Sequence, residues 1–421
     1  MGNINPARQA AHTSLVSCLA NDKFVNLEVS AILKRTNLQG ADRGLYTALV
    51  YTTIERLLTI DYIISKLSSR PVDEIDEKTL CAVRLGICQL EFMDKIPPHA
   101  AVDESVELCP RKSRGFANAL LRSFLRKKPD MPKKEGGELL YLSVKYSTPV
   151  ELCELFVRDY GDEAEAVLAA FLEKKDTAIR VNSLRAESAE KAILMGAYKS
   201  ELCRDVMLVK SFDGVLDGVE RGDWFVQDEA SALCAQMVGA KPGETVVDTC
   251  AAPGGKSFAL ALNMENKGRI YSFDLHDNKI SLIKKGAQKL GIDIIEAEAR
   301  DARNPREDII EKADRVLCDA PCSGFGVIGK KPDIKYKDVK ASEGLPRVQA
   351  QVIRGAAQYV KKGGVLVYST CTILKRENEE IVKDFLRENP QFELVEMKTM
   401  LPHIDGTDGF FICKMIRKET V

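Results

Sequence analysis

Two cysteines, Cys322 and Cys371, are the side chains in this sequence best suited to covalent chemistry. Each comes shortly after an apolar run with strand character, at residues 315–319 and 365–369. In an open α/β sheet, ligands bind outside the carboxyl ends of the strands, so both thiols are expected at one edge of a sheet. A single cysteine at a strand end is more often a buried small hydrophobe, so Cys322 by itself decides nothing.

A thiol beside an acid suits one reaction in particular. Carbon-5 of a pyrimidine is a poor nucleophile until a thiolate adds at carbon-6, which makes the ring an enamine that can accept a methyl group. Asp319 ends the run before Cys322, and an acidic group there can assist at ring nitrogen-3. Loss of the carbon-5 proton and expulsion of the thiolate complete the reaction. The residues therefore predict pyrimidine methylation, but chemical logic alone does not say which thiol attacks.

Acidic residues also end other predicted strands. In ETVVDTCAAPGGKSFALAL an apolar strand ends at Asp248, and Gly254 and Gly255 would let a ligand approach the backbone at a helix N-terminus. Asp274 stands where an acid hydrogen-bonds ribose hydroxyls, and Asp301 can meet an adenine amino group. With Asp319, these acids suit the sulfonium of S-adenosylmethionine better than a pyrophosphate, which they would repel. Helix capping would explain one or two of them.

The main competing interpretation is a phosphate-binding loop, because GGKS resembles the end of the pattern G-x-x-x-x-G-K-[ST]. That pattern needs a glycine where Cys250 stands, and Pro253 removes one of the amides that cradle phosphate. Asp319 could then mimic a magnesium-binding acid. A nucleotide hydrolase is therefore the alternative from a different enzyme class.

From about Gln227 onward, strands alternate with helical patterns, which is typical of a doubly wound sheet. Strands are predicted at residues 245–248, 269–274, 293–296, 315–319, 365–369, near 392–395 and at 409–416, with helices at 278–290 and 345–360. A short polar connection before the last strand predicts that it runs antiparallel to its predecessor. We therefore expect a mixed seven-stranded sheet in an α/β domain.

The first 130 residues show helical periodicity instead, with apolar stripes such as Leu80, Val83, Ile87 and Leu90. A basic block between residues 111 and 134 could neutralise phosphates, or could be a solvated helix end and a charged linker. Its candidate RNA-binding residues are Arg111, Lys112, Arg114, Arg122 and Arg126. Residues 127–137 have the prolines and glycines of a linker, and residues 148–172 predict one or two helices.

Composition favours a globular protein of more than one domain. Of 421 residues, 45% are hydrophobic and 29% charged. The sequence contains no run of eighteen apolar residues and no apolar signal core near the N-terminus, so a cytoplasmic protein is expected. The twelve scattered cysteines and four separated histidines favour reduced thiols and no metal.

Several runs resemble known families. DRGLYTALVYTTIERLLTIDYII, AVRLGICQLEFMDKIPPHAAVDESVEL and RGFANALLRSFLR are similar to a NusB-like RNA-binding domain. The runs CAAPGGK, FDLH, DAR, DAPCSGFGVIGKKPDIK, YSTCTILKRENEE and DGFFICKM resemble the RsmB/Sun-type RNA (cytosine-5-)methyltransferases. Ser257, where a Thr is usual, and Ala299 and Arg300, where a Gly is common, are slight departures from the pattern.

The resemblance implies a multidomain chain. It predicts an all-α NusB-like domain over residues 1–130, a linker and small α/β connecting subdomain over 131–226, and a Rossmann-like class I methyltransferase domain over 227–421. In the connecting subdomain TAIRVNSLR predicts a strand, and Arg180 and Asn182 match a motif that grips RNA, although on spacing alone they are surface polar residues. Lys330 and Lys331 are expected to hold phosphates near the pocket.

The resemblance also orders the two thiols. It implies that Cys371 is the nucleophile, that Cys322 helps release the product and that Asp319 contacts a cytosine taken out of its stack. The cofactor, S-adenosylmethionine, would be lined by Cys250, Ala251, Ala252, Pro253, Gly254, Gly255, Lys256, Asp274, Asp301 and Asp319. The predicted substrate is small-subunit ribosomal RNA and the predicted state a monomer; a tRNA substrate and a non-catalytic NusB-type RNA-binding factor remain alternatives.

Overall fold

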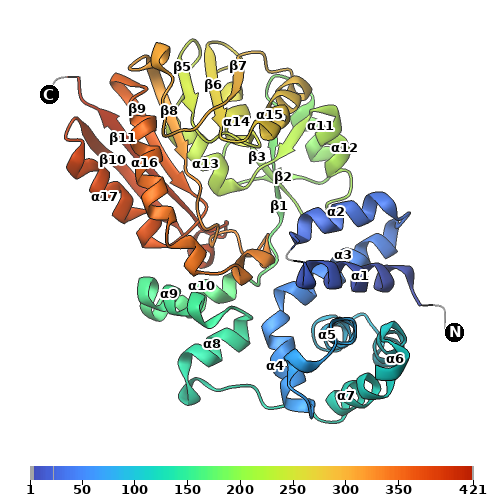
Figure 1. Cartoon of the computed structure of the whole chain (residues 1–421). Helices are drawn as coiled ribbons and strands as arrows, with labels where there is room; N and C mark the ends of the chain where they lie inside the picture. Colours follow the sequence, from blue (N-terminus) through green and yellow to red (C-terminus); the bar gives the residue numbers. More distant parts are fainter. Residues whose placement is uncertain (1–3, 22, 420–421) are drawn as a thin grey trace. The chain divides into compact units, whose positions relative to one another are not determined.

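The structure, a computed structural model, describes residues 4–21 and 23–419. Its contacts divide the chain into two compact units (Figure 1). The helical unit runs up to Leu172 and includes Ile328–Lys337, and the sheet unit comprises Glu173–Val327 and Asp338–Val421. The chain therefore passes from one unit to the other three times.

The described residues of the helical unit form ten α-helices, besides short 3₁₀ helices. They are α1 (Pro6–Ala20), α2 (Val25–Arg35), α3 (Gly40–Glu55), α4 (Leu57–Leu67), α5 (Glu77–Phe92), α6 (Pro98–Leu108), α7 (Arg114–Arg126), α8 (Glu138–Tyr146), α9 (Val150–Tyr160) and α10 (Ala164–Ala170). Leu80, Val83 and Ile87, from the predicted stripe, are buried in a core with residues of α4, α6 and α7. The all-helical prediction for this region is confirmed.

A segment from the second half of the chain completes the helical unit. Residues Ile328–Lys337, which we call the strap, contain the 3₁₀ helix η6 (Pro332–Tyr336) and pack against α3. Lys335 is 1% exposed, and its ammonium group donates to the carbonyl of Glu55 at 2.7 Å. The hydroxyl of Tyr336 donates to the carbonyl of Ile54 at 2.8 Å. These bonds add donors at the C-terminal end of α3, where the last turn of a helix has few intrahelical partners.

The sheet unit begins with a small antiparallel sheet. Its four strands lie in the order β2 (Tyr198–Lys199), β3 (Val206–Val209), β1 (Thr177–Val181) and β4 (Trp224–Val226), with α11 (Ser188–Leu194) and α12 (Val215–Arg221) alongside. The sequence predicted β1 but not its three partners. Those strands have only two to four residues, too few for an alternating pattern to stand out.

The seven-stranded mixed sheet is confirmed, with the strand order β10-β11-β9-β8-β5-β6-β7. The strands are β5 (Thr245–Asp248), β6 (Arg269–Asp274), β7 (Ile295–Ala299), β8 (Ala313–Asp319), β9 (Val360–Thr370), β10 (Phe392–Met400) and β11 (Phe410–Arg417). β11 is antiparallel to β10, as predicted, and it is also antiparallel to β9, whereas β5 to β9 run parallel. β7 starts two residues later than the third predicted strand, and β9 is longer than predicted.

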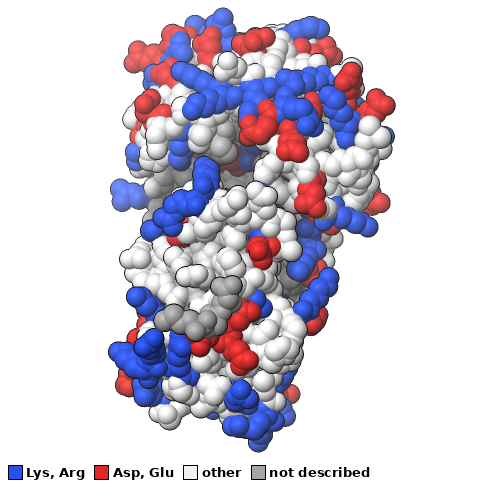
Figure 2. Space-filling model, turned by 90° about the vertical axis from the view of Figure 1, so that its right-hand side faces the viewer, with Lys and Arg blue, Asp and Glu red and all other residues white. Residues whose placement is uncertain are grey.

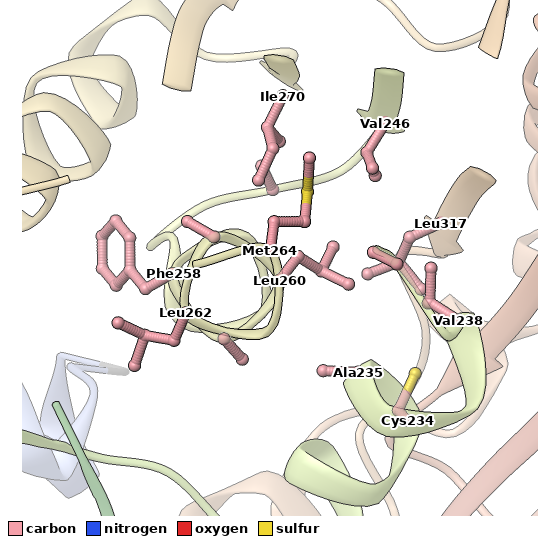
Figure 3. Packing of buried hydrophobic residues seen from close by; sticks show 14 of the residues in the cluster. Cys234, Ala235, Val238, Val246, Phe258, Leu260, Leu262, Met264, Ile270 and Leu317 are labelled. Atoms are coloured by element: carbon pink, nitrogen blue, oxygen red, sulfur yellow. The ribbon is translucent and has the colours of Figure 1, made fainter. Parts of the chain in front are cut away.

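Alternate residues of the central strands supply two cores, one on each face of this sheet. Val246 and Leu317 pack with α13 (Glu229–Val238), α14 (Gly255–Asn263) and α15 (Asp277–Leu290). Figure 3 shows Phe258 and Leu260 of α14, and Met264 directly after it, in that layer. Val247 and Val316 face the other layer, which includes α16 (Leu345–Ala357) and α17 (Glu379–Glu388). α18 (Pro402–Asp405) connects β10 to β11. Both faces of the sheet are thus covered, as a parallel sheet requires.

The two compact units divide after Leu172, while the predicted domain boundaries near residues 130 and 226 stay a prediction. Helices α8 to α10 belong with the N-terminal helices, because Thr59 of α4 donates to the carbonyl of Val144 and Leu58 to the hydroxyl of Ser147. The small sheet instead joins the large one. None of the described helices combines the length and the apolar character that a membrane crossing requires.

Candidate active site

The two cysteines meet at the carboxyl edge of the large sheet. Cys322 lies in the loop after β8, and Cys371 follows the last residue of the neighbouring strand β9. Their sulfur atoms are 3.2 Å apart, a hydrogen-bonding distance for thiols and too long for a disulfide. The prediction that both thiols lie at one edge is confirmed.

Asp319 ends β8 between two partners. One carboxylate oxygen accepts from the ammonium group of Lys256 at 2.7 Å, and the other accepts from the hydroxyl of Ser369 at 2.8 Å. Lys256 was predicted only as part of the cofactor loop, whereas the structure directs its ammonium group to Asp319. Its ammonium also lies 5.1 Å from the centre of the Phe410 ring.

The ionisation of this group of residues follows from burial and pairing. Burial opposes the charged form of Lys256, but the adjacent Asp319 outweighs it and raises the pKa of the amine. The hydrogen bond with Cys371, followed by burial, raises the pKa of Cys322 well above its ordinary value. Lys256 is therefore an ammonium at neutral pH, and Cys322 keeps its proton.

A buried glutamate that the sequence analysis missed holds the Cys322 loop. The carboxylate of Glu377, which is fully buried, accepts from the backbone amide of Ser323 at 3.0 Å and from the amide group of Gln349 at 2.8 Å. Gln349 also donates to the carbonyl of Pro321. Glu377 lies in the 3₁₀ helix η8 (Lys375–Glu377), in the polar run after Cys371. Its position in a run of charges gave no signal of burial.

Two glycines allow a second contact between the cysteine loops. The amide of Gly326 donates to the carbonyl of Cys371 at 3.0 Å, and the amide of Gly409 donates to the carbonyl of Gly326 at 2.8 Å. A Cβ on Gly326 would lie 2.0 Å from the carbonyl oxygen of Gly409. The backbone approaches here too closely for any side chain, so the relative position of the two thiols depends on glycine.

The loop between β5 and α14 is a tight turn. The amide of Gly254 donates to the carbonyl of Ala251 at 2.7 Å, and Gly254 has a φ of 115°. The amide of Ala251 donates to Phe273, and that of Ala252 to the carboxylate of Asp274 at 3.3 Å. These amides are already bonded and cannot cradle a phosphate. The geometry therefore counts against the nucleotide-hydrolase alternative.

Within this loop, Pro253 is exposed and Ala251 is buried, while Ala252, Gly255 and Lys256 are partly buried. Cys250 packs against the core on the side of α16, and burial raises the pKa of its thiol well above the ordinary value. A thiol that keeps its proton is a poor nucleophile. Cys250 is thus a packing residue of the loop.

Asp248 lies beneath the same loop and is 1% exposed. One carboxyl oxygen accepts from the hydroxyl of Ser257 at 2.7 Å, and that hydroxyl is 2.8 Å from the hydroxyl of Ser272. Burial raises the pKa of Asp248 to about 7. Ser257, at a position where a Thr was expected, makes this contact with Asp248 through its hydroxyl.

The acids at the strand ends fit S-adenosylmethionine. Asp274 is 8% exposed, and its second oxygen accepts from the amide of His276 at 3.1 Å, which leaves lone pairs for ribose hydroxyls. Asp301 is held by two hydrogen bonds from the guanidinium group of Arg303, which lower its pKa. With Asp319, these two carboxylates form an acidic edge that suits a positive sulfur. Among the described residues, no group of three or more potential ligands could hold a metal.

Most of the predicted basic residues lie on the surface of the helical unit. Arg111, Lys112, Arg122 and Arg126 are exposed, and Arg114 is partly buried with its guanidinium group bonded to Glu107. Figure 2 shows Lys and Arg side chains gathered at the bottom of the view. Lys330 and Lys331 are exposed on the strap. These positions are accessible to a polyanion.

The interpretation of Arg180 and Asn182 as RNA-gripping residues is not supported, and neither is the alternative that they are surface residues. Both side chains are fully buried. Arg180 donates to the side chain of Asn263 at 2.7 Å, and Asn182 donates to the carbonyls of Gly222 and Leu290 at 2.9 Å each. They join the small sheet to the ends of α14 and α15, a role that the sequence pattern does not distinguish from RNA contact.

The fold and the acidic carboxyl edge together define an S-adenosylmethionine-dependent methyltransferase. Residues 235–416 match the family model "16S rRNA methyltransferase RsmB/F", and residues 5–126 match the NusB family. A Bacillus subtilis protein named "Probable ribosomal RNA small subunit methyltransferase B" is 38% identical, over 98% of each chain. The "Ribosomal RNA small subunit methyltransferase B" of Yersinia pseudotuberculosis is 31% identical, over 93% of this chain and 94% of its own.

Among solved structures, the crystal structure of PH0851 is similar over 97% of this chain and 98% of its own, with a TM-score of 0.82 and 28% identity. The chain belongs to the RsmB/F family of ribosomal RNA small subunit methyltransferases and carries a NusB domain at its front. It is an S-adenosylmethionine-dependent RNA methyltransferase, so the hydrolase and the non-catalytic RNA-binding factor are both excluded as descriptions of the chain.

Proposed function

We propose that this enzyme methylates carbon-5 of a cytosine in 16S ribosomal RNA through a covalent bond from Cys371 to carbon-6. The observation that carries the proposal is the pair of thiols 3.2 Å apart beside Asp319. A methyltransferase acting on an amino group or a hydroxyl needs no thiol at all, whereas carbon-5 chemistry needs a nucleophile that adds and later leaves.

The proton distribution between the thiols supports Cys371 as the nucleophile. The contact with Cys371 and burial raise the pKa of Cys322, so we propose that Cys322 keeps its proton and donates its S–H to the sulfur of Cys371, 3.2 Å away. The sulfur that accepts this hydrogen bond is the one better able to become the thiolate. Cys371 then forms the bond to carbon-6, and the displaced electron pair moves toward ring nitrogen-3.

Asp319 and Lys256 are suited to hold the cytosine edge. They offer a carboxylate acceptor and an ammonium donor whose charged atoms are 2.7 Å apart. Cytosine presents an acceptor at nitrogen-3 and a donor at its exocyclic amino group, so the pair matches both. A donor at nitrogen-3 also stabilises the charge that develops there when the thiolate adds.

S-adenosylmethionine supplies an electrophilic methyl group to the enamine carbon, and Cys250 to Lys256, Asp274, Asp301 and Asp319 are proposed to line its site. Water then takes the carbon-5 proton, the electron pair of that C–H bond restores the double bond between carbon-5 and carbon-6, and the bond from carbon-6 to Cys371 breaks with its electron pair returning to sulfur. Cys322, which contacts Cys371, is the residue placed to assist this release.

RNA would be held by the basic surface of the helical unit and by the strap. We propose phosphate contacts for Arg111, Lys112, Arg114, Arg122, Arg126, Lys330 and Lys331. The target base must be unpaired or flipped out, because a thiol cannot reach carbon-6 inside a stack. We further propose that the enzyme acts as a monomer in the cytoplasm.

The roles of the two cysteines can be distinguished by what their alanine variants do to the RNA. With tritiated S-adenosylmethionine and unmodified 16S ribosomal RNA, Cys371→Ala is expected to reduce methyl transfer to background. Cys322→Ala is expected to leave enzyme bound to RNA in denaturing gels, because addition proceeds while release is blocked. The double variant is the control and should give no adduct. An adduct formed by Cys371→Ala instead would reverse the roles.

The substrate class needs a separate measurement. Bisulfite sequencing of 16S ribosomal RNA and tRNA, from cells with and without the enzyme, should reveal one protected cytosine in the ribosomal RNA. Protection in tRNA alone would favour the alternative substrate. No protection in either RNA, with methyl transfer intact, would contradict carbon-5 chemistry.

A further inference from the structure

The strap and the start of α2 enclose a small hollow within the helical unit. Its volume is about 210 Å³, and it is lined by Phe24, Asn26, Lys331, Asp333 and Lys337 among others. None of these residues belongs to the catalytic group or to the basic surface of α7. The hollow combines an aromatic ring, an amide, a carboxylate and two cationic side chains.

The aromatic ring is open to solvent. Phe24 is 49% exposed, although it stands directly before α2 and the buried Val25. The ammonium group of Lys337 lies 5.2 Å from the centre of its ring. A cation and a π face are therefore adjacent, which is the pairing that a nucleotide needs for its phosphate and its base.

The polar lining is compatible with the same ligand. Asp333 is the carboxylate of the hollow, and it accepts from the amide of Val25 at 3.4 Å, so the amino end of α2 offsets part of its charge. Asn26 has both a donor and an acceptor for a base edge. Lys331 and Lys337 are exposed at the two ends of η6, where they can contact the RNA backbone.

The strap is held rigidly enough to form a site. Lys335 and Tyr336 are bonded to backbone carbonyls of α3, and Ile334 is buried at 7% exposure. The side chains on either side of these anchors, Lys331 and Lys337, are therefore presented from a fixed backbone. A surface loop without such anchors would have to be ordered on binding, at a cost in affinity.

The chain also limits the distance from this hollow to the reacting base. Lys331 follows Cys322 by nine residues. An extended chain of that length spans at most about 30 Å, so a nucleotide in the hollow is within that range of the Cys322 loop.

We propose that this hollow binds an unpaired nucleotide of the RNA substrate that flanks the target cytosine, with its base stacked on Phe24 and its phosphates on Lys331 and Lys337. This inference rests on the proposed function for the identity of the substrate. It adds a contact that selects unpaired RNA around the target, because a base inside a duplex cannot stack on a side chain.

The direct test is binding of a short fluorescein-labelled single-stranded RNA to the full-length enzyme, followed by anisotropy. Phe24→Leu, which keeps an apolar side chain but removes the ring, should weaken binding on the order of tenfold. Phe24→Tyr keeps an aromatic ring and should therefore bind the RNA as the unchanged enzyme does. A merely structural effect of replacing Phe24 would not distinguish the two variants in this way. Lys331→Gln and Lys337→Gln should each lower the slope of log affinity against log salt by about 0.7. Lys34→Gln, at the far end of α2, is the matched control.

Equal RNA affinity of Phe24→Leu and the unchanged enzyme would overturn the site. Competition by a polyglutamate peptide that also depends on the Phe24 ring would assign the hollow to an acidic protein and would overturn it equally. Because binding is measured without methyl transfer, a failure of the proposed cytosine methylation would appear in the tritium assay alone. The two results are therefore distinguishable.

Discussion

At the scale of single residues, Asp248 shows how the cofactor loop depends on an acid that the fold prefers to keep neutral. Its carboxyl is buried beneath the turn, and one of its oxygens has no hydrogen-bond partner. Burial raises the pKa of Asp248 from 3.8 to about 7. A protonated carboxyl satisfies Ser257 without the energetic cost of a buried charge.

This raised pKa predicts a pH dependence of stability. The stabilisation from a protonated Asp248 is complete below about pH 4 and is lost as the pH rises to about 7, because the unfolded chain releases its proton earlier. Asp248→Asn mimics the protonated form at every pH. Relative to the unchanged enzyme, the free energy of unfolding of the variant should rise by up to about 4 kcal/mol between pH 4 and pH 7, and this difference should stay constant above pH 7.

Urea denaturation at several pH values measures the difference, with the exposed Asp217→Asn as the charge-matched control. A constant difference between Asp248→Asn and the unchanged enzyme from pH 4 to pH 8 would contradict the assignment.

Single residues also mark the limit of what the sequence predicts. The positions of Cys322, Cys371 and Asp319 follow from strand ends, because parallel strands bring their carboxyl ends to one edge. The burial of Glu377 does not follow from the sequence, since its neighbours are charged. The surface position that spacing alone gave Arg180 was wrong, because its side chain is buried. Its RNA contact stays a prediction, since a motif records which residues are required, but not whether they contact a ligand or another part of the fold.

At the scale of elements, the approach of the loop after β8 to the residue before β11 fixes the geometry of the thiols. Gly326 contacts the backbone of both Gly409 and Cys371. The strands were predictable from their apolar runs, and the antiparallel final strand from its short connection. The contact between the loops was not, because it depends on backbone atoms brought together by the strand order β11-β9-β8.

Adding one methyl group at this contact should therefore be costly. Gly326→Ala is expected to lower the free energy of unfolding by about 1–3 kcal/mol, because its Cβ would overlap the Gly409 carbonyl and the loops would have to separate. Methyl transfer should fall as well, since the distance between Cys322 and Cys371 would change. Gly344→Ala is the control, because its Cβ would meet no atom within 4 Å. Equal stability of the two variants would contradict the prediction.

At the scale of the whole molecule, the two units are interleaved along the chain. The apolar patterns predicted a helical half and a sheet half, but the ten residues of the strap, which lie in the later half, make their contacts within the helical unit. The strap was read as part of the catalytic pattern because it directly continues the run that contains Cys322. Sequence order gave no sign that Lys335 and Ile334 are buried against helices encoded some 280 residues earlier.

The helical unit should therefore be incomplete without the strap. A fragment of residues 1–172 is expected to bind a peptide of residues 326–339 in trans. At a peptide concentration 100 times its dissociation constant, this binding should raise stability by about 2.7 kcal/mol. The same peptide with Tyr336→Ala, which lacks the bond to Ile54, should raise the melting temperature less. Identical melting of the fragment with and without the peptide would show that the strap contributes nothing to this unit.

The interleaved order also has a consequence for synthesis on the ribosome. Domains generally fold as units in the order in which they emerge. The NusB-type helices emerge first, yet their packing around α3 cannot be completed until residue 337 has been made. By then the residues of β5 to β8 and of the Cys322 loop have already been synthesised. The nascent helical unit therefore lacks its contacts with the strap, and the carbonyls that the strap binds face water, until much of the catalytic sheet has been synthesised.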